Sequence, residues 1–158
     1  MKSQGFRKID FQEELREYFY SINIEWLKEY FDPTAEDLRI LKNPEEIISM
    51  GGRIVFISAG KEPIGTCALI PADEDKVRLI KMGVKKDWRG RGAGKFLLQS
   101  AIEEAKTMGA GKIVLETSEK LQAAKAVYSS AGFRQTGIEI IHPEFGRKVF
   151  EMQLELDK

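Results

Sequence analysis

The first third of the chain carries apolar side chains at helical spacing. Between residues 10 and 50 these positions recur every three or four residues, which predicts helices with one buried face. The series runs through Leu15, Tyr18, Phe19, Ile22, Trp26 and Tyr30. Pro33 and Pro44 interrupt the pattern and Gly51-Gly52 ends it. We therefore expect a helical N-terminal region that is broken at the two prolines.

The rest of the chain alternates between β-rich runs and two further helical patterns. Runs of β-branched and aromatic residues predict six strands, over residues 53–58, 64–70, 77–84, 112–117, 133–141 and 147–156. Helical periodicity predicts helices over about residues 92–108 and 119–130. Thr117 or Ser118 can cap the second of these helices. This order of elements predicts an α/β chain with one mixed sheet.

The composition narrows the setting in which the protein works. The 158 residues suit one domain, residues 1–158, with a substantial core, and 42% apolar with 32% charged residues is typical of a soluble globular protein. No apolar run approaches the ~18 residues of a membrane-spanning helix, and residues 1–14 lack the apolar stretch of a secretory signal. These two absences favour no membrane partner. With a single cysteine, no internal disulfide forms, which favours the cytoplasm.

Charge is balanced overall but unevenly placed. The 25 basic and 25 acidic residues cancel, so no nucleic-acid partner is expected. Residues 9–50 hold eleven acids and four bases, a net charge of −7, and residues 76–95 hold eight bases and one acid, a net charge of +7. Solvated surfaces explain both segments as well as ligands do. The functional alternative puts an anion at the basic segment and a cation at the acidic one.

A glycine-rich loop, Arg89-Gly90-Arg91-Gly92-Ala93-Gly94-Lys95, stands between a predicted strand and a predicted helix. The first turn of a helix offers unpaired N–H groups to an anion, and glycines let the backbone approach phosphate oxygens. A P-loop would need glycine at Arg89 and Ser or Thr at Phe96, and a dinucleotide fingerprint would need glycine at Lys95. The spacing therefore favours a phosphate site of another kind, with a plain strand–helix turn as the alternative.

The loop and the residues after it resemble the GCN5-related N-acetyltransferase (GNAT) superfamily. Arg89-x-x-Gly92-x-Gly94 matches the pyrophosphate-binding pattern of that family. The family's later motifs are matched by Leu115-Glu116-Thr117, Ala124-x-x-x-Tyr128 and Gly132-Phe133. The specific match covers residues 77–135, and Ile24-Glu25-Trp26-Leu27 resembles an uncharacterised bacterial subgroup. The resemblance implies a single GNAT-like domain with a mixed, mostly antiparallel sheet of six to seven strands, flanked by four helices.

The resemblance implies acetyl-CoA as the co-substrate. The residues expected to contact it are Met82, Val84, Arg89, Arg91, Gly92, Ala93, Gly94, Lys95, Ala124 and Tyr128. One position departs from the family pattern. Many members have Asn three residues before the alanine of the Ala-x-x-x-Tyr motif, whereas this chain has Leu121. One polar contact to the pantetheine arm or to the helix is therefore expected to be absent.

The resemblance also implies direct transfer of the acetyl group to a primary amine of a small molecule or peptide. A backbone N–H at a bulge of the strand before the loop is expected to stabilise the oxyanion. This role maps to Met82, Gly83 or Val84, with Val84 the first choice, and Gly83 suits a bulge. Tyr128 matches the family's general acid, with a core tyrosine as the alternative.

The general base is not identifiable from the sequence. Where the family often has a glutamate, the strand before the loop carries Arg78 and Lys81, which leaves His142, Glu116 and Glu144 as candidates. Cys67 has no basic partner in the sequence, so it is expected to be a buried small residue rather than a nucleophile. No cluster has the ligand spacing of a metal site.

The acceptor and the class of function stay open at this level. The acidic, aromatic N-terminal helices suggest a cationic acceptor such as a polyamine, a lysine-like amine or a basic peptide end, although the aromatics suit a helix–sheet core equally well. The alternatives to an enzyme are a non-catalytic acyl-CoA-binding sensor or scaffold and a nucleotide-binding regulator. Pairing of edge strands, which is frequent in the family, allows a homodimer.

Overall fold

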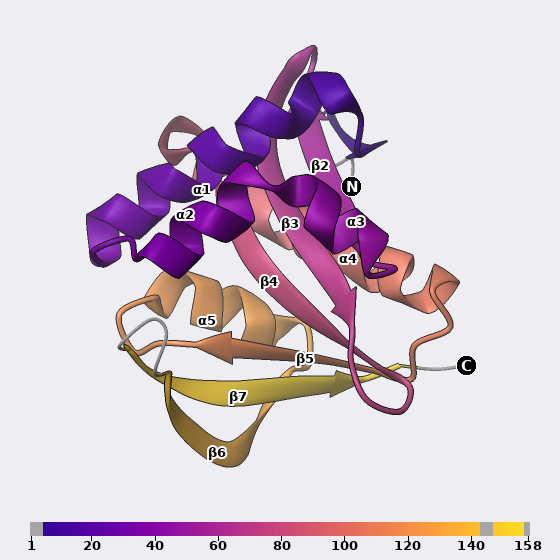
Figure 1. The fold of residues 1–158 in the computed structure, drawn as a ribbon, viewed down its shortest axis with the longest axis vertical. Coiled ribbons are helices and arrows are strands. Elements are labelled where there is room, and N and C mark those ends of the chain that lie inside the picture. Colours follow the sequence, from indigo (N-terminus) through magenta and orange to yellow (C-terminus); the bar gives the residue numbers. More distant parts are fainter. Residues whose placement is uncertain (1–4, 143–146, 157–158) are drawn as a thin grey trace.

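The computed structural model describes residues 5–142 and 147–156, which form one seven-stranded sheet with helices on both faces (Figure 1). The strands are β1 (Phe6–Asp10), β2 (Arg53–Ala59), β3 (Glu62–Pro71), β4 (Lys76–Val84), β5 (Lys112–Thr117), β6 (Arg134–His142) and β7 (Arg147–Glu155). The α-helices are α1 (Arg16–Tyr30), α2 (Ala35–Lys42), α3 (Pro44–Ser49), α4 (Ala93–Thr107) and α5 (Gln122–Ser130), with 3-10 turns at Glu13–Leu15 and Lys86–Trp88.

The sheet has the order β1-β2-β3-β4-β5-β7-β6. Every neighbouring pair is antiparallel except β4 and β5, which are parallel and joined by the α4 crossover. The predicted mixed, mostly antiparallel sheet with about four substantial helices is therefore confirmed in the described residues. None of their helices has the length and hydrophobicity needed to cross a bilayer.

Helices α1, α2 and α3 cover one face of the sheet, over β2, β3 and β4 (Figure 1). Helix α1 buries Phe19 and Leu27 against Phe56 of β2. Helix α2 begins with a reciprocal capping box, in which the Thr34 hydroxyl accepts the Asp37 N–H and the Asp37 carboxylate accepts the Thr34 N–H. These contacts fix the residue at which α2 begins.

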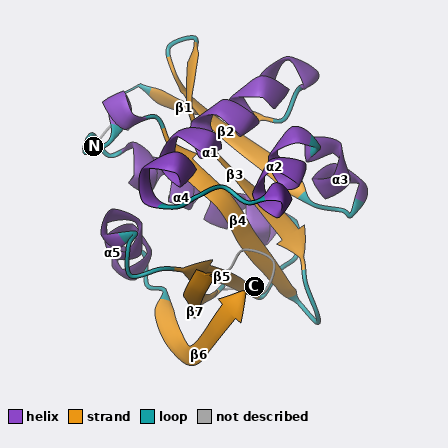
Figure 2. Ribbon diagram, turned by 60° about the vertical axis from the view of Figure 1, so that its left-hand side comes forward, coloured by secondary structure: helices purple, strands orange, loops and turns teal. Residues whose placement is uncertain are grey.

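Helices α4 and α5 cover the opposite face, and Figure 2 shows α5 beside β5, β6 and β7, apart from α1–α3. The apolar stripe of α4 includes Leu97, Leu98 and Ala101, which are buried against the sheet. On the same helix the buried carboxylate of Glu104 pairs with Lys8 of β1 and Arg53 of β2. These ion pairs tie the edge strand to the layer beneath it.

The strands β4 and β5 separate along their length (Figure 1). They pair only at Lys76–Leu79 of β4 with Lys112–Leu115 of β5. Beyond Leu79, the edge of β4 that would continue the pairing has no strand beside it among the described residues. The sheet therefore opens just before the glycine loop.

The structure corrects the expected position of the β-bulge. Cys67 of β3 lies opposite two residues of β4, Lys81 and Met82, and Lys81 has a φ of 51°. Gly83 lies outside the bulge and pairs with Thr66. A Cβ on Gly83 would lie 2.5 Å from Trp26, so this glycine provides space for the indole of α1.

The sequence analysis missed one strand and misplaced the start of one helix. Strand β1 was not predicted, because only Phe6 is buried in a run that is otherwise mostly polar and exposed. Helix α5 begins at Gln122 rather than at residue 119, because the Ser118 hydroxyl accepts the Lys120 N–H and its carbonyl accepts the Leu121 N–H. Ser118 therefore caps a turn that precedes the helix.

Candidate active site

The glycine loop ends in an open helix N-terminus. Gly92 is the N-cap of α4 with φ 86°, and no side chain in the described part of the chain caps the helix. The first bond within the helix runs from the Phe96 N–H to the Gly92 carbonyl, at 3.0 Å. The N–H groups of Ala93, Gly94 and Lys95 therefore have no intrahelical partner and carry the positive end of the α4 dipole. This is the geometry of an anion site.

The glycines of the loop serve its conformation more than its packing. Gly90 and Gly92 have φ values of 77° and 86°, in the region that favours glycine. A Cβ on either residue would meet nothing within 4 Å. Gly94 has an ordinary φ, and its Cβ would meet Val127 at 3.8 Å, an ordinary contact. Neither its backbone conformation nor its described neighbours therefore require glycine at position 94.

The three cations of the loop have different surroundings. Arg91 and Lys95 are exposed, and the guanidinium of Arg91 lies 5.0 Å from the centre of the Trp88 ring. Arg89 points into the protein, where its Nε donates to the Val84 carbonyl at 3.2 Å and its Nη1 donates to Glu29 at 2.8 Å. The hydrogen bond from Arg89 lowers the pKa of Glu29. Arg89 therefore supports the loop instead of reaching from it.

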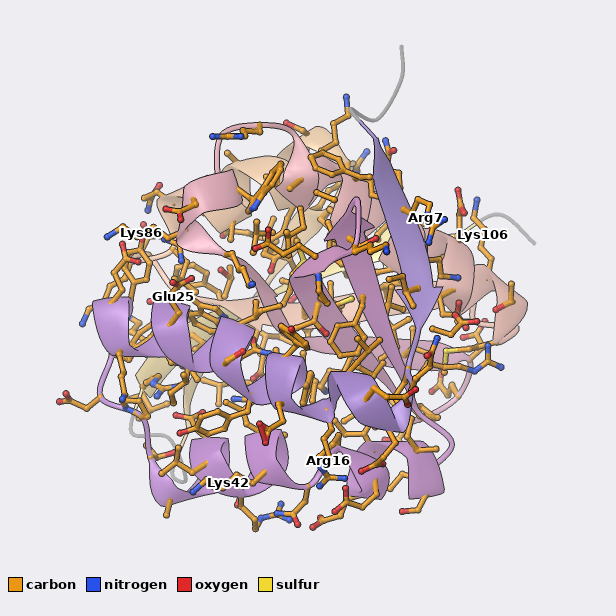
Figure 3. All side chains as sticks on the ribbon, turned by 90° about the horizontal axis from the view of Figure 1, so that it is seen from above. Arg7, Arg16, Glu25, Lys42, Lys86 and Lys106 are labelled. Atoms are coloured by element: carbon orange, nitrogen blue, oxygen red, sulfur yellow. The ribbon has the colours of Figure 1, made fainter. Side chains whose placement is uncertain are left out.

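Acidic residues of α1 hold the segment between β4 and α4. Glu25 accepts the Lys86 N–H at 2.9 Å, and Figure 3 shows the two residues side by side. Near the other end of α1, Arg16 donates to the Lys42 carbonyl at 3.1 Å (Figure 3). Charged side chains at both ends of α1, one acidic and one basic, therefore hold the helix to neighbouring segments.

The backbone of β4 offers a donor at the sheet opening. The Lys85 N–H donates to the Ile64 carbonyl of β3 at 2.8 Å. Because successive N–H groups of a strand point to opposite edges, the Val84 N–H points away from β3. Its neighbouring carbonyl is the one that accepts from Arg89. The Val84 N–H therefore faces the side on which β4 and β5 have separated.

A cavity of about 520 Å³ lies where the sheet opens. Its walls come from α1, α2, β3, β4, β5, α5 and β7. Of the predicted contact residues it brings together Met82, Ala124 and Tyr128, with Leu121 at the same wall. Residues of the glycine loop do not line this cavity. The predicted cofactor residues thus form two groups, the loop and the cavity, with β4 leading from one to the other.

Tyr128 is 7% exposed and lies at the wall of this cavity. Its ring contacts Phe133, with centroids 5.8 Å apart, and its hydroxyl makes no hydrogen bond within the described part of the chain. Burial, with a smaller effect of the Cys67 thiol, raises the pKa of Tyr128 well above its ordinary value. The residue is therefore both a core tyrosine and a protonated hydroxyl at a cavity wall.

The three candidates for the general base and the cysteine have different outcomes. Glu116 lines the cavity, and Arg78 donates to it at 3.5 Å. Glu144 and the side chain of His142 lie outside the described residues. Cys67 is fully buried, which raises the pKa of its thiol to about 12, so a thiolate nucleophile is disfavoured. No metal-binding group of three His, Cys, Asp or Glu side chains occurs in the described ranges.

The sequence did not indicate a charged cluster on the α1–α2 side of the cavity. Asp37 of α2 is buried and bonded to Lys81 at 2.8 Å and to Arg147 at 2.6 Å. Lys81 and Arg147 both line the cavity. Nothing local marks these residues as partners, because 44 and 110 positions separate Lys81 and Arg147 from Asp37 along the chain.

Curated relatives match part of the chain. Human N-acetyltransferase 8B is 29% identical over 101 residues, which make up 60% of this chain and 44% of that protein. The uncharacterised N-acetyltransferase YvbK of Bacillus subtilis strain 168 is 32% identical over 107 residues, 65% of this chain and 69% of that protein. The matched region thus spans less than half of the length of the human relative.

Solved structures share the fold along nearly the whole chain. A GNAT-family acetyltransferase of Staphylococcus aureus Mu50 aligns with a TM-score of 0.80 at 24% identity, covering 96% of this chain and 99% of that chain. Spermidine N-acetyltransferase from Vibrio cholerae, in complex with CoA and spermine, aligns with a TM-score of 0.76 at 17% identity, covering 98% and 96%. At 24% and 17% sequence identity, this similarity shows a shared fold and nothing further.

The sequence profile of the acetyltransferase (GNAT) family matches residues 9–133, most of the chain and nearly all of the region that builds the loop and the cavity. The predicted superfamily is confirmed by this match and by the relative YvbK, so this chain belongs to the acetyltransferase (GNAT) family.

Proposed function

We propose that this protein is an acetyl-CoA-dependent N-acetyltransferase, which moves an acetyl group directly to a primary amine. The observation that carries the proposal is the sheet opening. The open helix N-terminus and the Val84 N–H follow the point where β4 leaves β5, and Tyr128 lies at the wall of the cavity that β4 also lines. The activity belongs to one domain, residues 1–158, and to the cytoplasm, where the single cysteine stays reduced.

The loop supplies the binding site for the diphosphate of the co-substrate. The N–H groups of Ala93, Gly94 and Lys95 would donate to phosphate oxygens. Arg91 and Lys95 add exposed positive charge. Gly92 gives the backbone the left-handed turn that opens the helix. Arg89 stabilises the loop through its hydrogen bonds to the Val84 carbonyl and to Glu29.

The opening supplies the groups for acyl transfer. Acetyl-CoA supplies an activated thioester carbonyl, to which the amine nitrogen forms a bond as the bond to sulfur breaks. The Val84 N–H would stabilise the negative charge that develops on the acetyl oxygen. Tyr128 would donate its proton to the departing thiolate. A tyrosine with its ordinary pKa of about 10 is already protonated at neutral pH, and burial raises the pKa of Tyr128 further. Met82 and Ala124 form walls on either side.

The amine must lose one proton before or during the attack. Of the three candidates for the general base, we assign this role to Glu116, because its side chain lines the cavity. An amine of pKa about 10.4 is almost fully protonated at neutral pH, so the acceptor arrives as a cation. Spermine in the Vibrio cholerae neighbour is an amine of this kind. The acids of α1 and α2 that bond to groups of the protein itself are Glu25, Glu29, Glu36 and Asp37.

The test is thiol release from acetyl-CoA in the presence of a panel of primary amines, with product mass measured for each. We expect CoA thiol and an amine heavier by one acetyl group in equal amounts. Binding of acetyl-CoA without thiol release for any amine would contradict catalysis and support the acyl-CoA-binding sensor or scaffold. The Leu121 position, which has no polar side chain at the start of α5, is the observation that keeps this alternative open.

We further propose a homodimer through strand β6. This strand is an edge of the sheet and exposes Ile138 and Ile141, and exposed edge strands pair readily. Sedimentation equilibrium should give twice the chain mass, and a lower mass for Ile141→Lys. A monomer at all concentrations would contradict this assembly and leave the enzymatic proposal unaffected.

A further inference from the structure

Three charged side chains from distant parts of the chain meet at one side of the cavity, and two of them lie at its wall. They are Asp37 of α2, Lys81 of β4 and Arg147 of β7. The Lys81 Nζ donates to Asp37 Oδ1 at 2.8 Å, and the Arg147 Nη2 donates to Asp37 Oδ2 at 2.6 Å. The side chains are 0%, 10% and 15% exposed, respectively. Two cations therefore share one buried carboxylate.

The carboxylate of Asp37 faces the protein and not the cavity. It does not line the cavity, whereas Lys81 and Arg147 do. Its Oδ2 also accepts the Thr34 N–H at 2.9 Å, so both oxygens have donors from the protein. Burial alone would raise the pKa of Asp37, but the donors from Arg147 and Lys81 lower it below the ordinary value. Asp37 thus fixes the two cations and is not placed to receive the ammonium of a substrate.

The backbone places Lys81 at this wall through an unusual conformation. Lys81 is in the β4 bulge with φ 51°, a region that non-glycine residues seldom adopt. Such strained positions cluster at functional sites. A bulge re-aims a side chain relative to the regular alternation of a strand. Here it brings the ammonium of Lys81 to the cavity wall beside Arg147.

Arg147 is positioned by contacts on several sides. Its Nη2 also donates to the Asp32 carbonyl at 3.3 Å, and its guanidinium lies 4.5 Å from the centre of the Phe31 ring. A guanidinium has five N–H donors and an ammonium has three. Both groups line the cavity, where they would meet an anion that entered it. The planar guanidinium also matches the two oxygens of a carboxylate or the oxygens of a phosphoryl group.

The rest of this wall consists of apolar groups and carboxylates that have partners. Trp26, Ile40, Ile70 and Val149 line it, so the cations act in a medium of low polarity, where charge pairing is strengthened. Glu36 also lines it, and Arg39 holds both oxygens of Glu36 at 2.9 and 2.7 Å. The described groups of this wall therefore offer donors to an anion more directly than they offer a carboxylate to a cation.

We infer that the amine acceptor carries an anionic group, a carboxylate or an anion of similar geometry, which binds to Lys81 and Arg147. This inference rests on the proposed function and narrows its substrate class. The acceptor is then a zwitterion, with its ammonium directed to the sheet opening and its anion to the α2 side of the cavity. Simple polyamines lack the second group and are poor acceptors. Lys81 and Arg147 are specificity-determining residues and take no part in the bond changes.

The first arm of the test uses the wild-type protein. Thiol release is measured with ω-amino acids, ω-aminoalkyl phosphonates and plain alkylamines of matched chain length. Each kcat/KM is calculated from the concentration of the unprotonated amine, so that differences in amine pKa do not affect the comparison. For at least one chain length we expect kcat/KM to be at least about 10-fold higher with an anion than without, as a charge-assisted pair provides. The phosphonate series separates a carboxylate from a phosphoryl group.

The second arm uses variants with matched controls. Lys81→Met and Arg147→Gln should raise KM for the anionic acceptor about 10-fold or more, with the Kd for acetyl-CoA unchanged. Lys61→Met and Arg134→Gln, at exposed sites, should leave both quantities unchanged. Circular dichroism verifies that each variant is folded, and the wild-type arm is independent of this requirement.

The outcomes separate this inference from the proposed function. Equal kcat/KM with anionic and plain amines, or a preference for diamines, would overturn the anionic acceptor and leave the acetyltransferase standing. An anion preference that persists unchanged in both variants would remove Lys81 and Arg147 from the site. Absence of thiol release with every amine, together with intact binding of acetyl-CoA, would overturn the proposed function itself.

Discussion

Arg89, the first residue of the glycine motif, donates to Glu29 of α1 at 2.8 Å across the junction between the loop and the helix layer. The same guanidinium donates to the Val84 carbonyl, so one side chain links α1, the end of β4 and the phosphate loop. A residue at the start of a phosphate-binding pattern thus acts as an internal support. A change in the position of α1 is therefore expected to alter the conformation of the glycine loop.

Removing that support should weaken binding of acetyl-CoA without touching the phosphates directly. Arg89→Ala loses the hydrogen bonds to Val84 and Glu29, and we expect the Kd for acetyl-CoA to rise about 10-fold, since each charged hydrogen bond contributes about 1.5–3 kcal/mol. Arg134→Ala, at an exposed position, is the control. Isothermal titration calorimetry measures both, and an unchanged Kd for Arg89→Ala would show that the loop needs no such support.

Tyr128→Phe tests the general acid. Its hydroxyl has no hydrogen-bond partner in the described residues, so the melting temperature should change little. The kcat at pH 7.5 should fall by about 10²-fold or more, the usual effect of removing a general acid. The deficit should shrink above about pH 8.5, where a thiolate leaves without a proton. A kcat equal to that of the wild type across this range would leave Tyr128 as a core residue only.

Asp37→Asn tests the charged cluster through stability. It leaves Lys81 and Arg147 buried without their shared carboxylate, and we expect a loss of about 3 kcal/mol in unfolding free energy at pH 7. Because the folded-state pKa of Asp37 is lowered from 3.8, its contribution is present above that pH and is lost as pH falls through the folded value. The difference between wild type and variant should therefore narrow below about pH 4.

Urea denaturation at pH 7 and at pH 3 measures this narrowing. Asp87→Asn, on the exposed turn before the loop, serves as the control and should lie within about 0.5 kcal/mol of the wild type. A difference for Asp37→Asn that is the same at both pH values would contradict the ionised state of Asp37 in the folded protein.

Two glycine substitutions should affect different properties, one the stability of the fold and the other the affinity for acetyl-CoA. Gly83→Ala places a Cβ 2.5 Å from Trp26, whose indole is held by a 2.9 Å hydrogen bond to Asn23, and should destabilise the fold by about 1–3 kcal/mol. Gly94→Ala meets only an ordinary contact, so stability should hold while the Kd for acetyl-CoA rises. Thermal melts and titrations of both variants decide the matter, and a stable Gly83→Ala would refute the packing role.

The sequence was informative wherever the signal is local. The glycine spacing of residues 89–94 predicted the turn that opens α4, and strand-like runs predicted all strands except β1 to within a few residues. Cys67 was expected to be a buried small residue, and it is fully buried. These features depend on neighbours along the chain, which periodicity and turn chemistry report directly.

The features that sequence reasoning missed depend on long-range contacts. A lysine gives no sign that it adopts a left-handed φ, because the bulge at Lys81 arises from pairing with β3. The pairing of Asp37 with Arg147 joins residues 110 positions apart. Acidic residues of α1 and α2 suggested a cationic ligand, but Glu25, Glu29 and Asp37 bond to the protein's own N–H groups, arginines and lysine. Composition cannot separate charges that bind ligands from charges that hold elements together.

The most direct test of the central claim is the affinity for acetyl-CoA of the wild type, Gly92→Glu and Gly109→Glu, measured by calorimetry. Both glycines have left-handed φ values, 86° and 80°, and open space around the missing Cβ, so the two substitutions carry similar strain at opposite ends of α4. We predict binding by the wild type and by Gly109→Glu, and loss of binding by Gly92→Glu. No binding by the wild type, or equal loss in both variants, would contradict a co-substrate site at the N-terminus of α4.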